Sequence, residues 1–265
     1  MLTKKKLKIE EVVATHSIDV DGIPVRFPLA PYAPQHEAAT VVVRAIVGKQ
    51  NALIESPTGT GKTLALLCGA LAATTESDHR IFYCVRTHAQ ARQVVDELAR
   101  TCYRRPMAVL GARSRYCINE SVLRAPSIDA ACSEAVRGHT CVPYANAKDQ
   151  RWRFPDQPDE AWQADDLRAF GQHECLCPYA ASVKLSAAAG LVVCPYQYVL
   201  NAQCRQRDDL ALRDSDVVIF DEAHNMEDAS RDAFCRSISL ASLTVLIGDL
   251  FAVLHRYPAL QHRRA

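Results

Sequence analysis

Ser56-Pro57-Thr58-Gly59-Thr60-Gly61-Lys62-Thr63 decides the fold, because this stretch follows the short apolar run 52–54 and opens an apolar, helix-forming segment. Strand, glycine-containing turn and helix in this order predict a loop that binds nucleotide phosphates through all of the quoted residues. The glycines allow successive backbone N–H groups to face a phosphate, and the helix N-terminus adds a positive dipole end. Lys62 is expected to reach the β- and γ-phosphates, and Thr63 to bind the Mg²⁺ that bridges them. The alternative is a turn without a ligand, and Ser56 stands where the general pattern has glycine.

A second apolar run, Val217–Phe220, leads directly into Asp221-Glu222-Ala223-His224. We expect a fully buried central strand there, since uninterrupted apolar strands are typical of parallel sheets. Asp221 is expected to hold the Mg²⁺ of ATP through its hydration shell, and Glu222 to orient and deprotonate the attacking water. Taken alone, an Asp-Glu pair after a strand is more often the solvated start of a helix. The phosphate loop upstream favours the catalytic interpretation.

Segments with strand and helix patterns alternate around this loop. The alternation predicts an α/β fold with a parallel sheet and crossover helices. Between about residues 115 and 180 the apolar periodicity fades, and we expect a small, loop-rich inserted domain. The predicted strands are 52–54, 81–85, 107–110, 191–194 and 217–220, and the predicted helices are 63–73, 89–102 and a last helix with Leu240, Leu243, Ile247, Leu250, Phe251 and Leu254 on one face. That apolar face needs a packing partner.

The composition is that of an ordinary soluble globular protein, with 49% hydrophobic and 23% charged residues. The longest apolar run, Leu64–Ala73, is too short to span a bilayer, so we expect an intracellular protein with no membrane partner. A formal net charge of +1 gives no overall attraction to polyanions, so nucleic-acid binding must come from local patches. Basic and aromatic residues interleave in one region and offer phosphate contacts and stacking faces, with ordinary solvation as the alternative for each: Arg104, Arg105, Arg113, Arg115, Arg151, Arg153, Tyr116, Trp152 and Phe154.

The chain has 11 cysteines, an odd number in a protein too large to need disulfides, which indicates a reducing compartment where clustered thiols bind metal. Those in apolar runs are expected to be buried: Cys68, Cys84, Cys194 and Cys235. Those in the polar insertion are the candidate ligands: Cys117, Cys132, Cys141, Cys175 and Cys177. Four thiolates hold either a tetrahedral zinc ion or an iron–sulfur cluster, and the residues alone favour zinc slightly without separating the two.

Asp-Glu-Ala-His downstream of Gly-Thr-Gly-Lys-Thr resembles the DEAH-box helicases, and further segments are similar to the XPD-like iron–sulfur DNA helicases. The segment 86–90, Arg-Thr-His-Ala-Gln, resembles that family's motif Ia. Phe27-Pro28, Pro31-Tyr32 and Gln35 resemble its adenine-reading Q motif. The segments 111–118, 177–179 and 194–200 resemble those that flank the cluster domain. The resemblance covers nearly the whole chain from Gly22 to about Asp228.

Within this family, the start of the phosphate loop at 54–57 and the step from Cys132 to Cys141 look most like the regulators of telomere elongation. The Fanconi anaemia helicases share most of these features. The resemblance implies an ATP-dependent DNA helicase with a RecA-like P-loop domain and a [4Fe-4S] cluster. The implied catalytic residues are Lys62, Asp221, Glu222 and His224, the adenine contact is Gln35, the DNA contacts are Arg86, Thr87 and His88, and the cluster ligands are Cys117, Cys132, Cys141 and Cys177. Cys175 is an extra thiol that is able to substitute for or compete with Cys177.

The resemblance also predicts the domain boundaries. Residues 1–21 are an N-terminal tail, 22–112 and 181–235 are two parts of RecA-like helicase domain 1, 113–180 are the iron–sulfur insertion, and 236–265 start a truncated helical arch.

Helicases of this kind hydrolyse ATP between two RecA-like domains, and the second domain supplies arginine fingers. The sequence contains no such second domain, so we expect ATP binding with weak or absent unwinding, the rest being missing or supplied by another chain. The resemblance implies single-stranded or forked DNA as the partner, the nucleus as the location, and a role in DNA repair, telomere or genome maintenance. The alternative is a non-catalytic module that binds ATP and DNA, or an incomplete gene product.

Overall fold

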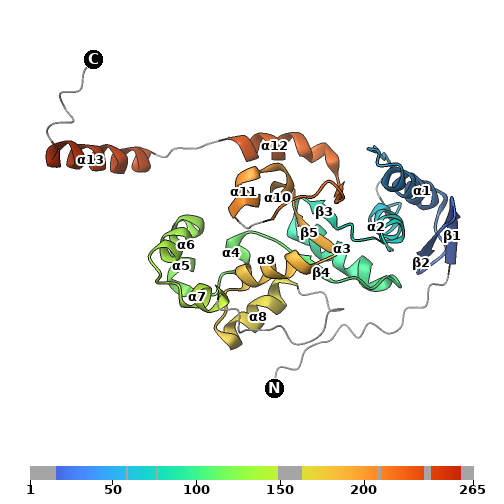
Figure 1. Ribbon diagram of the computed structural model, residues 1–265, viewed down its shortest axis with the longest axis horizontal. Helices are drawn as coiled ribbons and strands as arrows, with labels where there is room; N and C mark the ends of the chain where they lie inside the picture. Colours follow the sequence, from blue (N-terminus) through green and yellow to red (C-terminus); the bar gives the residue numbers. More distant parts are fainter. Residues whose placement is uncertain are drawn as a thin grey trace, which may run out of the picture.

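The computed structural model describes residues 16–57, 59–75, 77–148, 163–207, 210–235 and 240–257 (Figure 1). Several predicted residues lie outside this part of the chain: Thr58, Arg151, Trp152, Arg153 and Phe154. The elements in chain order are β1 (His16–Val20), β2 (Ile23–Phe27), α1 (Ala33–Val47), α2 (Lys62–Ala73), β3 (Ile81–Val85), α3 (His88–Arg100), β4 (Met107–Val109), α4 (Arg113–Tyr116), α5 (Glu120–Leu123), α6 (Ile128–Arg137), α7 (Val142–Lys148), α8 (Ala164–Glu174), α9 (Pro178–Ala188), β5 (Leu191–Pro195), α10 (Gln197–Leu200), α11 (Ala202–Arg207), β6 (Val217–Phe220), η1 (Ala223–Asn225), α12 (Met226–Phe234) and α13 (Leu240–Arg256).

A parallel sheet with the strand order β4-β5-β3-β6 forms the centre of the described fold. Every residue of β3 is buried, and its side chains alternate between two cores because successive residues of a strand point to opposite faces. Ile81, Tyr83 and Val85 pack with α2 and α3, whereas Phe82 and Cys84 pack with β5 and the segment that follows it. The predicted α/β fold with a parallel sheet is therefore confirmed.

Two predictions about the sheet are wrong. The predicted strand 52–54 is irregular in the structure, and its Leu53 side chain is 91% exposed. The strand β6 was expected to be central and fully buried, but within the described residues it pairs only with β3 and is half-buried. The partial exposure of β6 follows from its position, since no described strand covers its outer edge.

A β-hairpin lies within and just after the predicted N-terminal tail. Its strands β1 and β2 join through Asp21 and Gly22, whose φ angles of 52° and 87° suit a tight hairpin turn. Val25 and Phe27 are buried against α1 and α2. The hairpin therefore spans the boundary at Gly22 that the sequence suggested.

The insertion is helical where described, so the prediction of a loop-rich segment is wrong there. The insertion contains the helices α4 to α9, most of them short (Figure 1), and α4, α8 and α9 share a small core of Tyr116, Leu167, Tyr179 and Ala181. Local caps explain helix formation despite the weak apolar pattern, since the Asn119 side chain accepts hydrogen bonds from the start of α5 and Ser127 from the start of α6.

The predicted last helix is present as α13, and Figure 1 shows it apart from the α/β body. Its apolar side chains remain exposed, with Leu240 at 80% and Phe251 at 69%. No helix in the described part of the chain is long and apolar enough to cross a bilayer. Among the cysteines expected to be buried, Cys68, Cys84 and Cys194 are buried, but Cys235 is exposed because it lies at the end of α12 beyond the packed body.

Candidate functional site

The phosphate loop has the backbone that its glycines allow. Gly59 and Gly61 have φ angles of 80° and 73°, in the left-handed region that side chains disfavour. Gly61 is also the N-cap of α2, and a Cβ atom there would lie 2.2 Å from Nε2 of Gln35. Gly61 is therefore required both for the turn and for the close approach of Gln35.

Side chains of the loop bond to the loop itself. Nζ of Lys62 donates to the carbonyl oxygen of Ser56 at 2.7 Å. The hydroxyl groups of Ser56 and Thr60 are 2.7 Å apart, and Thr60 also donates to the carbonyl oxygen of Pro57 at 2.9 Å. These bonds hold the Lys62 ammonium over the turn where the phosphates are predicted to bind.

Gln35, the predicted adenine contact, lies against the same loop. Its Nε2 donates to the carbonyl oxygen of Gly61 at 3.3 Å, and its Oε1 accepts from the backbone N–H of Tyr32 at 3.0 Å. Gln35 is buried, whereas Tyr32 is 70% exposed. The structure thus gives Gln35 a supporting contact with the phosphate loop.

Asp221 lies at the carboxyl end of β6 and is buried. Its Oδ2 accepts a hydrogen bond from the Tyr83 hydroxyl at 3.2 Å, and Thr63 lies next to the same hydroxyl. Burial raises the pKa of Asp221, while the Tyr83 hydrogen bond and the charge of Lys62 act in the opposite direction. The structure therefore brings Asp221 next to Lys62 and Thr63, although Asp221 is far from these two residues in the sequence.

Glu222 and His224 follow on a short turn. Glu222 has a φ angle of 54°, an uncommon conformation for a residue with a side chain and one found at functional sites. Its Oε2 lies 3.4 Å from Nδ1 of His224. The backbone here is fixed by Tyr196, whose hydroxyl donates to the carbonyl oxygens of Asp221 and Glu222, and by Asn225, whose Nδ2 donates to the Glu222 carbonyl at 3.0 Å.

The segment Arg86-Thr87-His88, the predicted DNA contact, links the end of β3 to the start of α3. Thr87 is the N-cap of α3 and forms a capping box with Gln90. Nη1 of Arg86 donates to Oδ1 of Asn225, so this segment is joined directly to the turn after Asp221. Sequence reasoning missed Tyr83, Tyr196 and Asn225, because their roles depend on side-chain contacts between distant segments.

Most of the predicted basic and aromatic patch has structural contacts in the described chain. Arg105 donates to the carbonyl oxygens of Thr74, Ser77 and His79, and Arg104 donates to those of Thr101 and Tyr103. Tyr116 is 1% exposed and is therefore not available for stacking on a base. Arg115 remains as an exposed member of the patch.

The four predicted cluster ligands come from four segments of the insertion, and their thiols influence one another electrostatically. Burial raises the pKa of Cys117 and Cys132, and it raises the pKa of Cys177 to about 11. In each case other thiols of the set add to the increase, and Cys141 contributes in all three. Cys175 is exposed at the end of α8. Among the described residues, no three His, Cys, Asp or Glu side chains lie close enough to hold a single metal ion.

Polar hydrogens point toward these thiols, and this donor set fits an iron–sulfur cluster. Nη1 of Arg113 lies 3.7 Å from Sγ of Cys132, and Nδ2 of Asn119 lies 3.6 Å from Sγ of Cys141. Nε of Arg113 is buried without a hydrogen-bond partner in the described part of the chain. Buried donors usually have acceptors, and thiolate and sulfide sulfurs of a bound cluster are acceptors of this kind.

The sequence is similar to known helicases. Residues 83–243 match the DEAD_2 protein family. The Regulator of telomere elongation helicase 1 homolog of Caenorhabditis elegans is 34% identical over 87% of this chain and 27% of its own length. Regulator of telomere elongation helicase 1 of Homo sapiens is 32% identical over 79% of this chain and 21% of its own length. The chain thus spans about a quarter of the length of these relatives.

Solved structures share the fold. A structure described as XPD_Helicase matches with a TM-score of 0.54 and 19% identity, covering 74% of this chain and 33% of that one. A second, described as Truncated XPD, matches with a TM-score of 0.50 and 16% identity, covering 84% of this chain and 76% of that one. At such low identity the likeness concerns the fold, and it agrees with the predicted RecA-like architecture.

Proposed function

This chain belongs to the XPD-like helicase family, and we propose that it is the ATP-binding part of an ATP-dependent DNA helicase. The observation that carries the proposal is the convergence of Lys62 and Thr63 on Asp221, with Tyr83 hydrogen-bonded to Asp221 and next to Thr63. Phosphoryl transfer depends on positioning and on neutralising charge, and these groups have the chemistry for both.

In this proposal each residue has one role. The backbone N–H groups of Gly59 to Thr63 and the ammonium of Lys62 bind the phosphates. Thr63 and Asp221 would hold Mg²⁺, which neutralises charge on the β- and γ-phosphates. Glu222 accepts a proton from the attacking water, and His224 beside it helps to fix the position of that carboxylate. Gln35 supports the loop from its buried position and contacts the adenine from there.

We also propose that the four cysteines Cys117, Cys132, Cys141 and Cys177 hold a [4Fe-4S] cluster. Two observations support this: Nε of Arg113 is buried without a partner among the described residues, and N–H groups are directed at two of the sulfurs. A cluster would join four segments of an insertion whose own core is small. The domain boundaries at 112–113, 180–181 and 235–236 belong to the same proposal.

The proposed substrate is single-stranded or forked DNA, contacted by Arg86, Thr87 and His88, in nuclear DNA repair or telomere maintenance. Support comes from the relatives named as regulators of telomere elongation. Because the arginine fingers of such helicases come from a second RecA-like domain, we expect ATP binding by this chain and little unwinding without that domain.

The test is ATP binding and hydrolysis by the anaerobically purified chain, with and without single-stranded DNA. Lys62→Ala should weaken nucleotide binding about tenfold or more, since it removes charge-assisted hydrogen bonds to phosphate. Lys148→Ala, on the exposed end of α7, is the matched control and should have no effect. DNA-stimulated hydrolysis that depends on Lys62 would establish a motor fragment. Nucleotide binding without turnover would mean a half-built site, either in a fragment that needs the second RecA-like domain or in the alternative, a non-catalytic ATP- and DNA-binding module. Absence of both nucleotide binding and turnover in the wild type would refute the proposal.

A further inference from the structure

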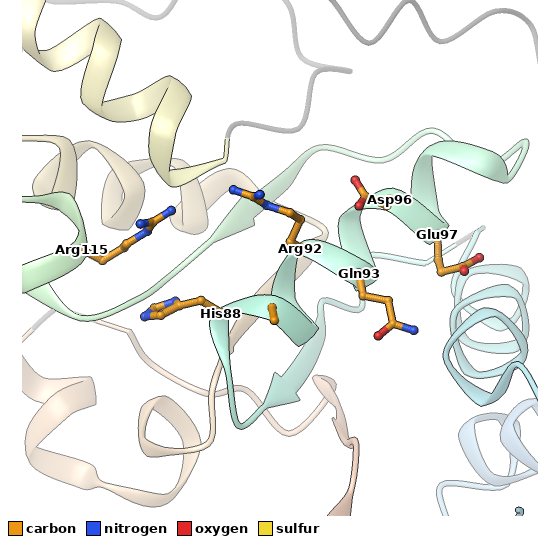
Figure 2. A pocket seen from close by; sticks show the side chains of 7 residues that line it. His88, Arg92, Gln93, Asp96, Glu97 and Arg115 are labelled. Carbon is orange, nitrogen blue, oxygen red and sulfur yellow. The ribbon is translucent and has the colours of Figure 1, made fainter. Parts of the chain in front are cut away.

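An open pocket of about 570 Å³ lies between α3 and the insertion, outside the phosphate loop (Figure 2). Its lining includes His88 and Arg92 from α3 and Arg115 from α4. Figure 2 shows these three basic side chains gathered at one end, with Asp96 and Glu97 farther along α3. Glu97 is paired with Arg100 at 3.1 Å, so part of the acidic end is already neutralised. The pocket therefore has a cationic end next to the proposed DNA contact His88.

Two arginines at this end share one carboxylate. Nη2 of Arg92 lies 3.1 Å from Oδ2 of Asp165, and Nη2 of Arg115 lies 3.0 Å from Oδ1 of the same residue. Asp165 is in the first turn of α8, so the three residues come from three separate helices. Each guanidinium thus contacts one oxygen of the same anion, and arginines bind the oxygens of a phosphate group in the same way.

The pairs are exposed, with side-chain accessibilities of 56% for Arg92, 38% for Arg115 and 59% for Asp165. Exposed ion pairs contribute little to stability and are screened by salt, so a competing anion is able to displace the carboxylate. Arg92 follows His88 by four residues and lies on the same face of α3. A strand bound at His88 would therefore meet Arg92 next.

We propose that Arg92 and Arg115 form a phosphate-binding subsite for single-stranded DNA, and that Asp165 occupies this subsite until the DNA backbone displaces it. The proposal rests on the proposed DNA-binding function and adds a subsite and its competitor. Since Asp165 belongs to the insertion and Arg92 to the RecA-like part, DNA binding would exchange a contact between these two parts for contacts with the strand.

The test is the affinity of the full chain for fluorescein-labelled oligothymidylate, measured by anisotropy over a series of salt concentrations. Asp165→Asn should tighten binding about threefold to tenfold, because it removes the competing charge. Arg92→Ala and Arg115→Ala should each weaken binding by a similar factor and reduce the salt slope by about 0.7, the value for one lost phosphate contact on a single strand. The matched controls are Glu120→Gln and Arg124→Ala, which alter an exposed pair elsewhere in the insertion and should leave both quantities unchanged.

A gain of affinity in Asp165→Asn cannot arise from misfolding, so this variant is the decisive one. Unchanged or weaker DNA binding by Asp165→Asn would contradict the proposal that Asp165 competes with DNA. Unchanged DNA binding by both arginine variants would contradict the proposal that Arg92 and Arg115 form a phosphate-binding subsite. In either case wild-type binding to DNA leaves the proposed function standing. If the wild-type chain binds ATP but no oligothymidylate, both the subsite and the DNA-binding part of the proposed function fail. Inorganic phosphate that competes with DNA in the wild type but not in Arg92→Ala would show that a free anion also uses the subsite.

Discussion

The hydroxyl of Tyr83 donates a hydrogen bond to Oδ2 of Asp221 at 3.2 Å, and Thr63 lies next to the same hydroxyl. One buried side chain on β3 is thus adjacent to both predicted Mg²⁺ ligands. The same strand continues into Arg86, which donates to Asn225 on the turn after Asp221. The predicted DNA contact and the predicted nucleotide site are therefore connected through a single strand.

Tyr83→Phe should reduce the apparent affinity of the chain for Mg²⁺-nucleotide about tenfold, because a hydrogen bond to a charged group is lost without a change of shape. Nucleotide binding should be measured as a function of Mg²⁺ concentration. Tyr103→Phe is the matched control, since that hydroxyl accepts a hydrogen bond from the backbone of Arg26, away from the site. Equal Mg²⁺ dependence in the wild type and Tyr83→Phe would show that Tyr83 only fills space.

Asp221 should make stability depend on pH when Mg²⁺ is absent. Burial is the main cause that raises its pKa above the ordinary value of 3.8, so the folded chain binds this proton more tightly than the unfolded chain does. The contribution of Asp221 to the free energy of unfolding is therefore largest at low pH. It falls as the pH rises from 3.8 through the raised pKa, and it stays constant above that value.

Asp221→Asn should remove this contribution. In EDTA at neutral pH, urea unfolding should give a free energy of unfolding for Asp221→Asn that equals or exceeds that of the wild type, since the amide carries no buried charge and still accepts from Tyr83. A variant that is clearly less stable than the wild type at neutral pH would contradict the sign of this effect.

Local signals were sufficient to predict the phosphate loop, because the φ angles of Gly59 and Gly61 and the start of α2 depend on neighbouring residues. The contact between Tyr83 and Asp221 joins positions 138 residues apart and depends on the pairing of β3 with β6. Hydrophobic pattern also failed to distinguish an edge strand from a central one, since the run Val217–Phe220 is uniformly apolar whether or not a second strand covers it. In the insertion, caps such as Asn119 formed helices that apolar periodicity did not indicate.

Breaking the buried ion pair between Arg80 and Asp216 should destabilise the sheet. Nη2 and Nε of Arg80 lie 2.6 and 3.0 Å from the two carboxylate oxygens, and the side chains are only 9% and 1% exposed. Arg80→Ala leaves Asp216 buried and unpaired, so urea unfolding should show a loss of about 3–5 kcal/mol. The control Arg44→Ala breaks an exposed pair with Asp21 and should cost about 0–1 kcal/mol. Equal losses in the two variants would contradict the role of burial.

Cys175 and Cys177 provide a test of the proposed cluster, because they are two positions apart and differ in surroundings. Cys177 is partly buried at the N-cap of α9, and the charges of Cys141 and Cys132 contribute to the increase in its pKa. Cys175 is exposed at the end of α8, with a φ angle of 52°. Cys177→Ser should therefore lose most of the iron and acid-labile sulfide of the anaerobically purified chain, and Cys175→Ser should retain both. If Cys175→Ser lost the iron and sulfide and Cys177→Ser retained them, Cys175 would be the fourth ligand in place of Cys177. Stoichiometric zinc with no sulfide in the wild type would replace the cluster with a zinc site.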